Sequence, residues 1–186
     1  MILDHEQLED MIPYANDKLR DRFLSPLNKA MERFEINTPL RIAAFIAQVA
    51  HESGSLHYVE EIADGSAYEY RKDLGNLEPE ALAAAHAQKT TTGRFYKGLG
   101  LLQITGFYNM RACGKALGLD LVNHPRLLTE PVNACRSAAW FWKSHGCNEL
   151  ADTGNFGRIT KVINGGTNGA TERLKLYSNC KKVLSC

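Results

Sequence analysis

The stretch TPLRIAAFIAQVAHESG, residues 38–54, is the most informative part of the sequence for the fold. It opens with a threonine before a proline, the order that favours a helix start, with a cap followed by proline at the first helical position. Ile42, Phe45, Ile46 and Val49 then fall on one helical face, and alanines fill much of the rest. A helix that is apolar nearly all round is a buried core helix, so we predict one here.

This predicted helix ends in His51 and Glu52, before the glycine–serine break at 53–55. Glu52 follows Val49 by three residues, so it continues the stripe that faces the core. Partial burial and the negative end of the helix dipole both favour its protonated form, which a general acid requires. Neutralising such a group by Glu52→Gln is expected to leave stability equal or higher. A solvated acid at a helix end remains the alternative.

A second carboxylate, Glu61, follows nine residues later. In a continuous helix, nine residues would place it about 13 Å away on the opposite side. The break at 53–55 lets the chain turn back, so Glu61 can face Glu52. One buried and one water-accessible carboxylate are what glycoside hydrolysis needs. The neighbouring acids Glu60 and Glu69 are equally typical of a solvated surface.

The rest of the chain is predicted to be mostly helical. Further helices are expected after Asp4, after Ser25–Pro26, and over 79–88, 108–117, 131–144, 157–163 and 170–183. Long loops are expected between the third and fourth helices and over 89–102. Because no repeat or linker is evident, residues 1–186 are predicted to form a single catalytic domain without a separate cell-wall-binding module.

Composition excludes several classes of protein. The chain has 186 residues, 23% of them charged, and a formal net charge of +1, which argues against a nucleic-acid partner. No apolar run reaches the roughly 18 residues of a membrane span. The N-terminus, MILDHEQLED, is acidic rather than basic and then apolar, so we expect no signal peptide and synthesis in a cytoplasm.

Neither a metal nor another cofactor is expected. A zinc site from His51, Glu52 and His57 is disfavoured, because the histidines are six apart across a glycine rather than four apart on one helix face. The five cysteines form no CxxC pair and are expected to be free thiols packed as small hydrophobes.

Three separated motifs carry a family resemblance. HESG (51–54), GLGLLQITGFYNM (98–110) and INGGTN (163–168) resemble glycoside hydrolase family 19 in this order, over roughly residues 38–180. With AYEYRKDLGN (67–76), the likeness is closer to the phage and prophage endolysin branch than to plant chitinases. The resemblance implies a mainly α, lysozyme-like domain with a cleft between two lobes and at most a short β element.

The resemblance also implies roles for individual residues. Glu52 would be the general acid, Glu61 the base that activates water with inversion, and Thr105 would help to hold that water. The implied substrate-binding residues are Gln103, Tyr108, Asn109, Asn164 and Arg173. Arg173, on the last helix, would pair with the catalytic carboxylates. For Gln103, Asn109 and Asn164, turn or capping chemistry is the alternative from the residues alone.

Simple geometry is compatible with these roles. Gly98 and Gly100 would let the backbone approach a flat polymer, and Gln103 and Thr105, two residues apart, would share one face of a strand. Two departures stand out: Leu99 replaces the usual arginine, and Thr167–Asn168 (167–168) replaces the Ile-Glu common in plant members. The cysteines also do not reproduce the plant disulfide pattern.

The predicted function is therefore an endolysin of muramidase or lysozyme type. It would hydrolyse β-1,4-glycosidic bonds of peptidoglycan glycan strands with inversion, after synthesis in a host bacterial cytoplasm and release to the periplasmic cell wall. The alternative is a chitinase acting on N-acetylglucosamine polymers, and a non-catalytic sugar-binding protein is disfavoured by the presence of both glutamates. Inversion predicts carboxylate oxygens of Glu52 and Glu61 about 6.5–9.5 Å apart.

Assembly and membrane contact are also predicted. We expect a monomer. The last predicted helix, residues 170–183, is basic, with Leu174, Leu176, Tyr177 and Val183 available for packing. We expect it to close the core, with weak membrane contact as the alternative.

Overall fold

The computed structural model describes residues 3–186, and within them the chain is almost entirely helical. The ten α-helices of these residues are α1 (His5–Met11), α2 (Asp17–Arg33), α3 (Pro39–Glu52), α4 (Pro79–Ala87), α5 (Thr92–Phe95), α6 (Phe107–Leu117), α7 (Pro131–Ser144), α8 (Cys147–Asp152), α9 (Phe156–Asn164) and α10 (Ala170–Val183). Short 3₁₀ helices are η1 (Ser66–Tyr68), η2 (Lys72–Leu74) and η3 (Pro125–Thr129). Two isolated bridges, Glu60–Leu99 and Leu99–Ile104, are the β pairing found in this part of the chain. The predicted mainly α fold is confirmed.

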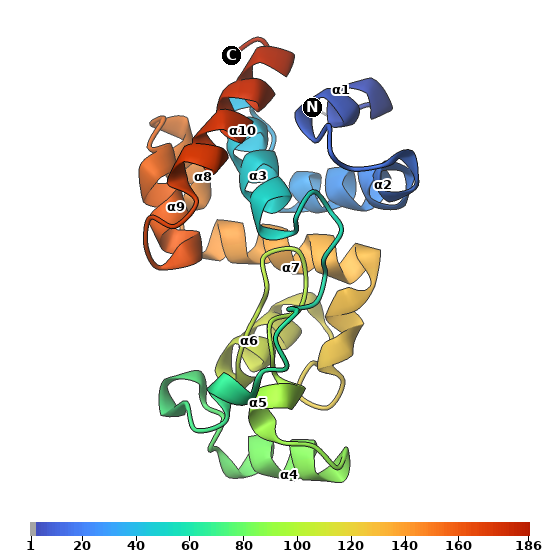
Figure 1. Cartoon of the computed structure of the whole chain (residues 1–186), viewed down its shortest axis with the longest axis vertical. Coiled ribbons are helices and arrows are strands. Elements are labelled where there is room, and N and C mark those ends of the chain that lie inside the picture. Colours follow the sequence, from blue (N-terminus) through green and yellow to red (C-terminus); the bar gives the residue numbers. More distant parts are fainter. Residues whose placement is uncertain (1–2) are drawn as a thin grey trace.

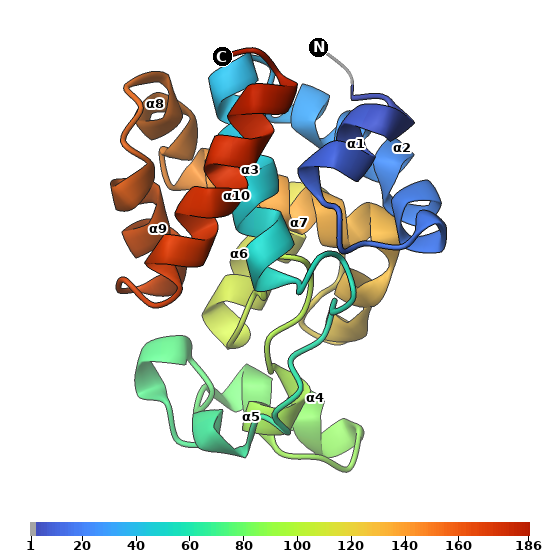
Figure 2. The ribbon, with the colours of Figure 1, turned by 45° about the horizontal axis from the view of Figure 1, so that its top comes forward.

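Helix α3 lies at the centre of the larger part of the molecule, with α10 packed along it (Figures 1 and 2). Its start follows the sequence signal: the Thr38 side chain accepts a hydrogen bond from the backbone N–H of Arg41, and Pro39 is the first helical residue. Every residue from Ile42 to Ala50 is buried. The predicted core helix is therefore confirmed, and it ends at Glu52.

The described residues form two hydrophobic cores. We call the larger one, built from α1–α3 and α7–α10, the large lobe; Phe45 and Trp142 meet in it edge to face at 5.4 Å. We call the other the small lobe, which contains α4, α6, η3 and the buried residues Tyr96, Leu99 and Ile104. Helix α7 contributes to both, and Figure 1 shows α4 and α5 at the end of the molecule opposite α1 and α10.

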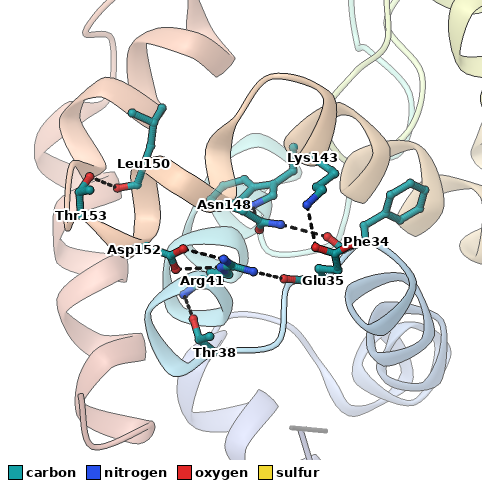
Figure 3. A network of polar contacts seen from close by, with 10 residues as sticks. Phe34, Glu35, Thr38, Arg41, Lys143, Asn148, Leu150, Asp152 and Thr153 are labelled. Atoms are coloured by element: carbon teal, nitrogen blue, oxygen red, sulfur yellow. Dashed lines mark hydrogen bonds and ion pairs between the residues drawn. The ribbon is translucent and has the colours of Figure 1, made fainter.

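The N-terminal end of α3 is anchored by a polar network (Figure 3). Arg41 donates to both carboxylate oxygens of Asp152 on α8, at 2.8 and 2.6 Å, and to the carbonyl of Glu35 at 2.8 Å. Lys143 of α7 donates to the Glu35 carboxylate at 2.8 Å. The hydrogen bond from Arg41 holds the pKa of Asp152 below its usual range. This network thereby ties α7, α8 and the segment before α3 to the helix whose other end carries Glu52.

Most predicted helices are confirmed, and the one expected to begin at Ser25–Pro26 starts elsewhere. Helix α2 begins at Asp17, because the Asn16 side chain accepts a hydrogen bond from the N–H of Leu19, and Pro26 lies inside the helix. The capping signal at Asn16 thus determines the start. Helices α5 and α8 were not predicted; both are short, and α5 occupies part of the expected loop over 89–102.

Four of the five cysteines are packed in the interior as predicted. Burial raises the pKa of the Cys113, Cys147 and Cys180 thiols to about 12, and Cys135 is buried as well. Cys186 is free but exposed, so the expectation of packed thiols is wrong for it, because it follows the last helical turn.

Helix α10 closes the large lobe, in keeping with the packing expected for it. It buries Arg173, Tyr177 and Cys180, and the Tyr177 ring stacks on Phe156 at 4.2 Å. Leu174, expected to pack, is instead 55% exposed, because it lies on the outer face of this helix. None of the helices in residues 3–186 combines the length and apolar character needed to cross a membrane.

Candidate active site

Glu52 is the last residue of α3, and its side chain is 22% exposed. The helix stops there because the Ser53 hydroxyl donates to the carbonyl of Val49 at 2.6 Å and accepts from the N–H of Leu56 at 2.9 Å. Gly54 follows with φ of +54°. The predicted break after Glu52 is confirmed, and it turns the chain toward Glu61.

Arg173 of α10 lies directly against Glu52. Its Nη2 is 2.5 Å from Oε1 of Glu52, an ion pair that lacks the alignment of a hydrogen bond. The guanidinium is 3% exposed; it also donates to the side-chain oxygen of Gln48 at 2.5 Å and to the carbonyl of Asn168 at 3.3 Å. Glu52 therefore has a buried cationic partner in addition to the partial burial expected from the sequence.

His51 lies next to this ion pair but adds no second cation near neutral pH. Burial, followed by the neighbouring Arg173 charge, lowers its pKa. The His51 ring packs so closely on Gly169 that a Cβ there would lie 2.5 Å from it. Within residues 3–186, no group of three or more His, Cys, Asp or Glu side chains is placed to hold a metal ion.

Glu61 is fixed in the loop after α3 by two donors. Tyr68 of η1 donates its hydroxyl to Oε1 at 2.8 Å, and the backbone N–H of Gly98 donates to Oε2 at 3.1 Å. Burial and the hydrogen bond to Glu61 raise the pKa of Tyr68, so it stays a donor. A carboxylate has about four lone-pair sites, so both oxygens of Glu61 can still accept from a water.

The adjacent Glu60 is occupied in ion pairs. Arg126 donates to both of its oxygens at 2.9 Å, and Lys97 lies 3.0 Å from one of them. The hydrogen bond with Arg126 is the main cause of its lowered pKa. Of the two neighbouring acids, Glu61 is therefore the one available as a base.

The segment GLGLLQIT, residues 98–105, forms a tight turn. Leu99 and Ile104 exchange backbone hydrogen bonds of 3.1 and 2.8 Å, and both are buried in the small lobe. Gln103 has φ of +47°, in the left-handed region. The expectation that Gln103 and Thr105 lie on one strand face is thus wrong, because the chain reverses between residues 99 and 104.

The two glycines of this turn make room for the protein itself. A Cβ at Gly98 would come within 3.0 Å of Oε1 of Gln103 and 3.2 Å of Oε2 of Glu61. At Gly100 it would lie 2.7 Å from the Ser137 hydroxyl of α7. These glycines therefore allow close internal packing around Gln103, Glu61 and Ser137, while the approach of a polymer to this backbone stays a prediction.

The other predicted residues after this turn make contacts in two different places. The Thr105 hydroxyl donates to the carbonyl of Gln103 at 3.1 Å, and Asn109 donates to the carbonyl of Thr105 at 2.8 Å. Hydrogen bonds therefore link Asn109 and Thr105 to Gln103, whose side chain packs with that of Glu61 around Gly98. Tyr108 bonds instead through its hydroxyl to Glu78 and is 38% exposed.

Asn164 lies on the Glu52 side. It is the last residue of α9, which Gly165 ends in the left-handed conformation, and the helix predicted over 157–163 is confirmed. Its amide donates to the carbonyl of Asn168 at 3.3 Å, the same carbonyl that accepts from Arg173. The candidates thus form two groups, one around Glu52 and one around Glu61, and no hydrogen bond or ion pair of the described residues links them.

Two residues of the site were not predicted. Tyr68 lies in the AYEYRKDLGN stretch that carried part of the resemblance, but it had no assigned role. Gln48 had a readable signal: it is the one polar residue in the run from Ile42 to Ala50, one helical turn before Glu52.

Comparison with known proteins identifies the family. The glycoside hydrolase family 19 model, described as chitinase class I, matches residues 35–153. An endochitinase of Arabidopsis thaliana is 40% identical over 126 residues, 67% of this chain and 39% of that protein. A Haemophilus influenzae protein named as containing a glycosyl hydrolase family 19 domain is 33% identical, over 73% of this chain and 76% of its own length. The chain belongs to glycoside hydrolase family 19.

Solved structures agree with this fold. A bacterial family 19 chitinase superposes with a TM-score of 0.79 at 24% identity, covering 99% of this chain and 95% of its own. The class IV chitinase of Zea mays gives a TM-score of 0.71 at 26% identity, covering 98% and 92%. This chain spans about half or less of the length of the first curated plant relatives, 39–51%.

Proposed function

We propose that this protein hydrolyses β-1,4-linked polymers of N-acetylated amino sugars with inversion, and that chitin-type polymers are its first substrate class. The observation that supports this most is the contrast between the two carboxylates. Glu52 lies at a helix end against a buried arginine, and Glu61 lies in a loop, held by two donors with lone pairs to spare. An inverting glycosidase needs such a division between acid and base.

The proposed chemistry assigns one step to each carboxylate. In its protonated form, Glu52 gives a proton to the glycosidic oxygen and returns to the carboxylate that pairs with Arg173, while Glu61 takes a proton from the water that attacks the sugar. Arg173 stabilises the negative charge that develops on Glu52 as its proton leaves, because the guanidinium is already in place. Tyr68 and the Gly98 N–H hold Glu61, the Gln103 side chain packs with it around Gly98, and the Thr105 hydroxyl donates to the Gln103 carbonyl.

Chitin comes first because two relatives from Arabidopsis thaliana are named endochitinases and the family model is described as chitinase class I. The second candidate is the peptidoglycan glycan strand, which has the same N-acetylated β-1,4 backbone. The nine-residue spacing of Glu52 and Glu61 and the AYEYRKDLGN run favour it through their likeness to endolysins. In that case the protein would be made in a host bacterial cytoplasm and act on the periplasmic wall after release.

A non-catalytic role is the third possibility that the experiment must address. A relative from Hevea brasiliensis, 30% identical over 89% of this chain and 63% of its own length, is named an inactive chitinase-like protein. Both proposed catalytic carboxylates are present here, which supports activity.

The test compares two purified substrates with the same enzyme preparation. Chitin oligosaccharides and peptidoglycan are each incubated with wild type and Glu61→Gln, and products are followed by proton NMR and mass spectrometry. Inversion predicts that the newly formed reducing end is first the α-anomer, and the mass of released muropeptides identifies which bond is cut. Cleavage of neither polymer by the wild type, or a β-anomer as first product, would contradict the proposal.

Weak membrane contact by α10 remains a separate proposal, supported by the basic residues Lys181 and Lys182 near its end. On purified, membrane-free substrate, neutralising this lysine pair should change activity little. Arg173→Ala should lower it tenfold or more, about 1.4 kcal/mol of barrier. Cosedimentation of the lysine variant with anionic vesicles tests the membrane contact itself; unchanged cosedimentation would remove it.

A further inference from the structure

Gln48 is an uncharged polar residue at the centre of the large lobe. It is 0% exposed and lies on α3 among residues that are otherwise apolar from Ile42 to Ala50. A buried amide is costly unless its hydrogen bonds are made, so its presence needs a reason. Its position supplies one, because residues four apart share a helix face and Gln48 is four before Glu52.

The contacts of Gln48 form a relay across three helices. Its Nε2 donates to the Thr160 hydroxyl of α9 at 2.9 Å, and its Oε1 accepts from Nη1 of Arg173 at 2.5 Å. Thr160 and Arg173 are 3% and 2% exposed. Since a guanidinium can only donate, the amide oxygen must face Arg173 and the NH₂ group must face Thr160. The relay therefore has a single orientation.

The relay fixes the guanidinium through nitrogens other than the one that faces Glu52. Nη1 is held by Gln48, Nε by the carbonyl of Asn168, and Nη2 is left for Glu52. An arginine has five donors in a rigid planar fork, so holding two of them sets where the third points.

The absence of charge on Gln48 matters as much as its shape. Around this ion pair, α3 contributes His51, whose pKa is lowered by burial and by Arg173, and α10 contributes Glu172, which is 4.0 Å from His51. The groups from α9 and the following loop are uncharged: the Thr160 hydroxyl accepts from Gln48, and the Asn168 carbonyl accepts from Arg173. A carboxylate at position 48 would share the guanidinium charge with Glu52.

We propose that Gln48 is a positioning residue for the reaction: with Thr160 it orients Arg173 against Glu52, and as an uncharged acceptor it leaves the guanidinium charge to Glu52. This inference rests on the proposed function, because the charge on Glu52 develops when it gives up its proton. Holding Arg173 in advance avoids reorganisation during that step. Its loss should therefore appear in kcat rather than in KM.

The experiment uses three relay variants and one matched control. Gln48→Met keeps the size but removes the acceptor, Gln48→Glu keeps the acceptor and adds a charge, and Thr160→Val removes the far partner. The control is Asn148→Leu, because Asn148 is also a fully buried amide with two hydrogen bonds, to Trp142 and to the Phe34 carbonyl. Steady-state kinetics are measured well below each variant's Tm on whichever polymer the wild type cleaves.

Gln48→Met should lower kcat tenfold or more and change KM less than about twofold. Asn148→Leu should lower kcat less than about threefold at a similar drop in Tm. Thr160→Val should show a smaller loss of the same kind. In Gln48→Glu, the alkaline limb of kcat/KM should move to higher pH, because the variant places a like charge beside Glu52. If Gln48→Met fails to fold, Thr160→Val and Gln48→Glu carry the test.

A second readout separates this inference from the proposed function. With ¹³C-labelled glutamate, the Glu52 carboxyl signal, assigned through Glu52→Gln, reports its titration without any turnover. Its midpoint should move to higher pH in Gln48→Glu. An unmoved midpoint, or a kcat loss in Gln48→Met no larger than in Asn148→Leu, would overturn the relay. A wild type that cleaves neither polymer would refute the proposed function alone, since the NMR titration would still test Gln48.

Discussion

Replacing Glu52 by glutamine should destabilise the protein, although the sequence alone led us to expect equal or higher stability. From the sequence alone, Glu52 is an isolated carboxyl, and its replacement by glutamine removes a burial cost. In the structure Glu52 is the carboxylate that faces the 3% exposed guanidinium of Arg173 at 2.5 Å. Its neutralisation leaves a buried cation with uncharged partners.

The size of the effect follows from this geometry. Removing one partner of a fully buried ion pair costs roughly 3–5 kcal/mol. Here the loss is smaller, because Glu52 is 22% exposed and the glutamine that replaces it would keep an oxygen that can accept from Arg173. We therefore expect a loss of about 2 kcal/mol, which for a chain of this length lowers Tm by roughly 4–8 °C. Activity should fall at least tenfold, since the proton donor is gone.

Thermal unfolding of wild type and Glu52→Gln at neutral pH provides the assay. The matched control is Glu172→Gln, which removes an exposed carboxylate beside Arg173 in the sequence and should stay within about 0.5 kcal/mol of wild type. Equal or higher stability of Glu52→Gln, or a loss no larger than that of Glu172→Gln, would refute the reasoning.

The remaining predictions concern the turn beside Glu61 and the anchor of α3. Gly98→Ala should lower kcat about tenfold with little change in Tm, because its Cβ at 3.0–3.2 Å must displace Gln103 and Glu61 by a few tenths of an ångström; unchanged kinetics would contradict this. Gln103→Gly should be more stable by roughly 0.5–1 kcal/mol, since φ is +47°, yet less active; a lower Tm would argue against strain. Asp152→Asn should lower stability at neutral pH, and the stability of this variant should fall less than that of wild type as the pH is lowered. Because folding lowers the pKa of Asp152, its contribution to stability is complete above about pH 3.8 and is lost as the pH falls through the pKa of the folded state. Urea unfolding at several pH values would check this, and parallel curves for both proteins would exclude it.

The helices could be predicted because their signals are local. Thr38–Pro39 starts α3, Gly165 ends α9, and both operate through backbone groups within one turn. Ser25–Pro26 has the same form as Thr38–Pro39 but lies inside α2, because an earlier cap at Asn16 had already begun the helix and a proline ten residues in was tolerated. A local signal therefore predicts where a helix can start, while competition between signals decides where it does.

The site could be predicted only in part. The direction of Glu52 followed from its place in the helical stripe, and the break after it gave Glu61 freedom to turn. The partners of these glutamates come from elsewhere in the chain: Gly98 is 37 residues from Glu61, and Arg173 is on the last helix. Spacing carries no information on such contacts. Family resemblance supplied Arg173. The contacts of Gln48 with Arg173 and of Tyr68 with Glu61 became clear only from the structure.

Position 99, where this chain has leucine in place of the family's arginine, is also explained only by contacts that the sequence does not reveal. From the sequence, leucine in place of arginine looked like the loss of a charge from a loop that lines a cleft. In the structure, Leu99 is 1% exposed in the small lobe, and its backbone takes part in both β bridges, with Glu60 and with Ile104. Leu99 thus links the segment that carries Glu61 to the turn that carries Gln103, while its side chain anchors both in an apolar core. An apolar residue stabilises that position by burial, and the charges nearby, Lys97 and Arg126, are already paired with Glu60. The substitution therefore leaves the surroundings of Glu61 intact, because its two donors are the Tyr68 hydroxyl and a backbone N–H that no side chain at position 99 supplies.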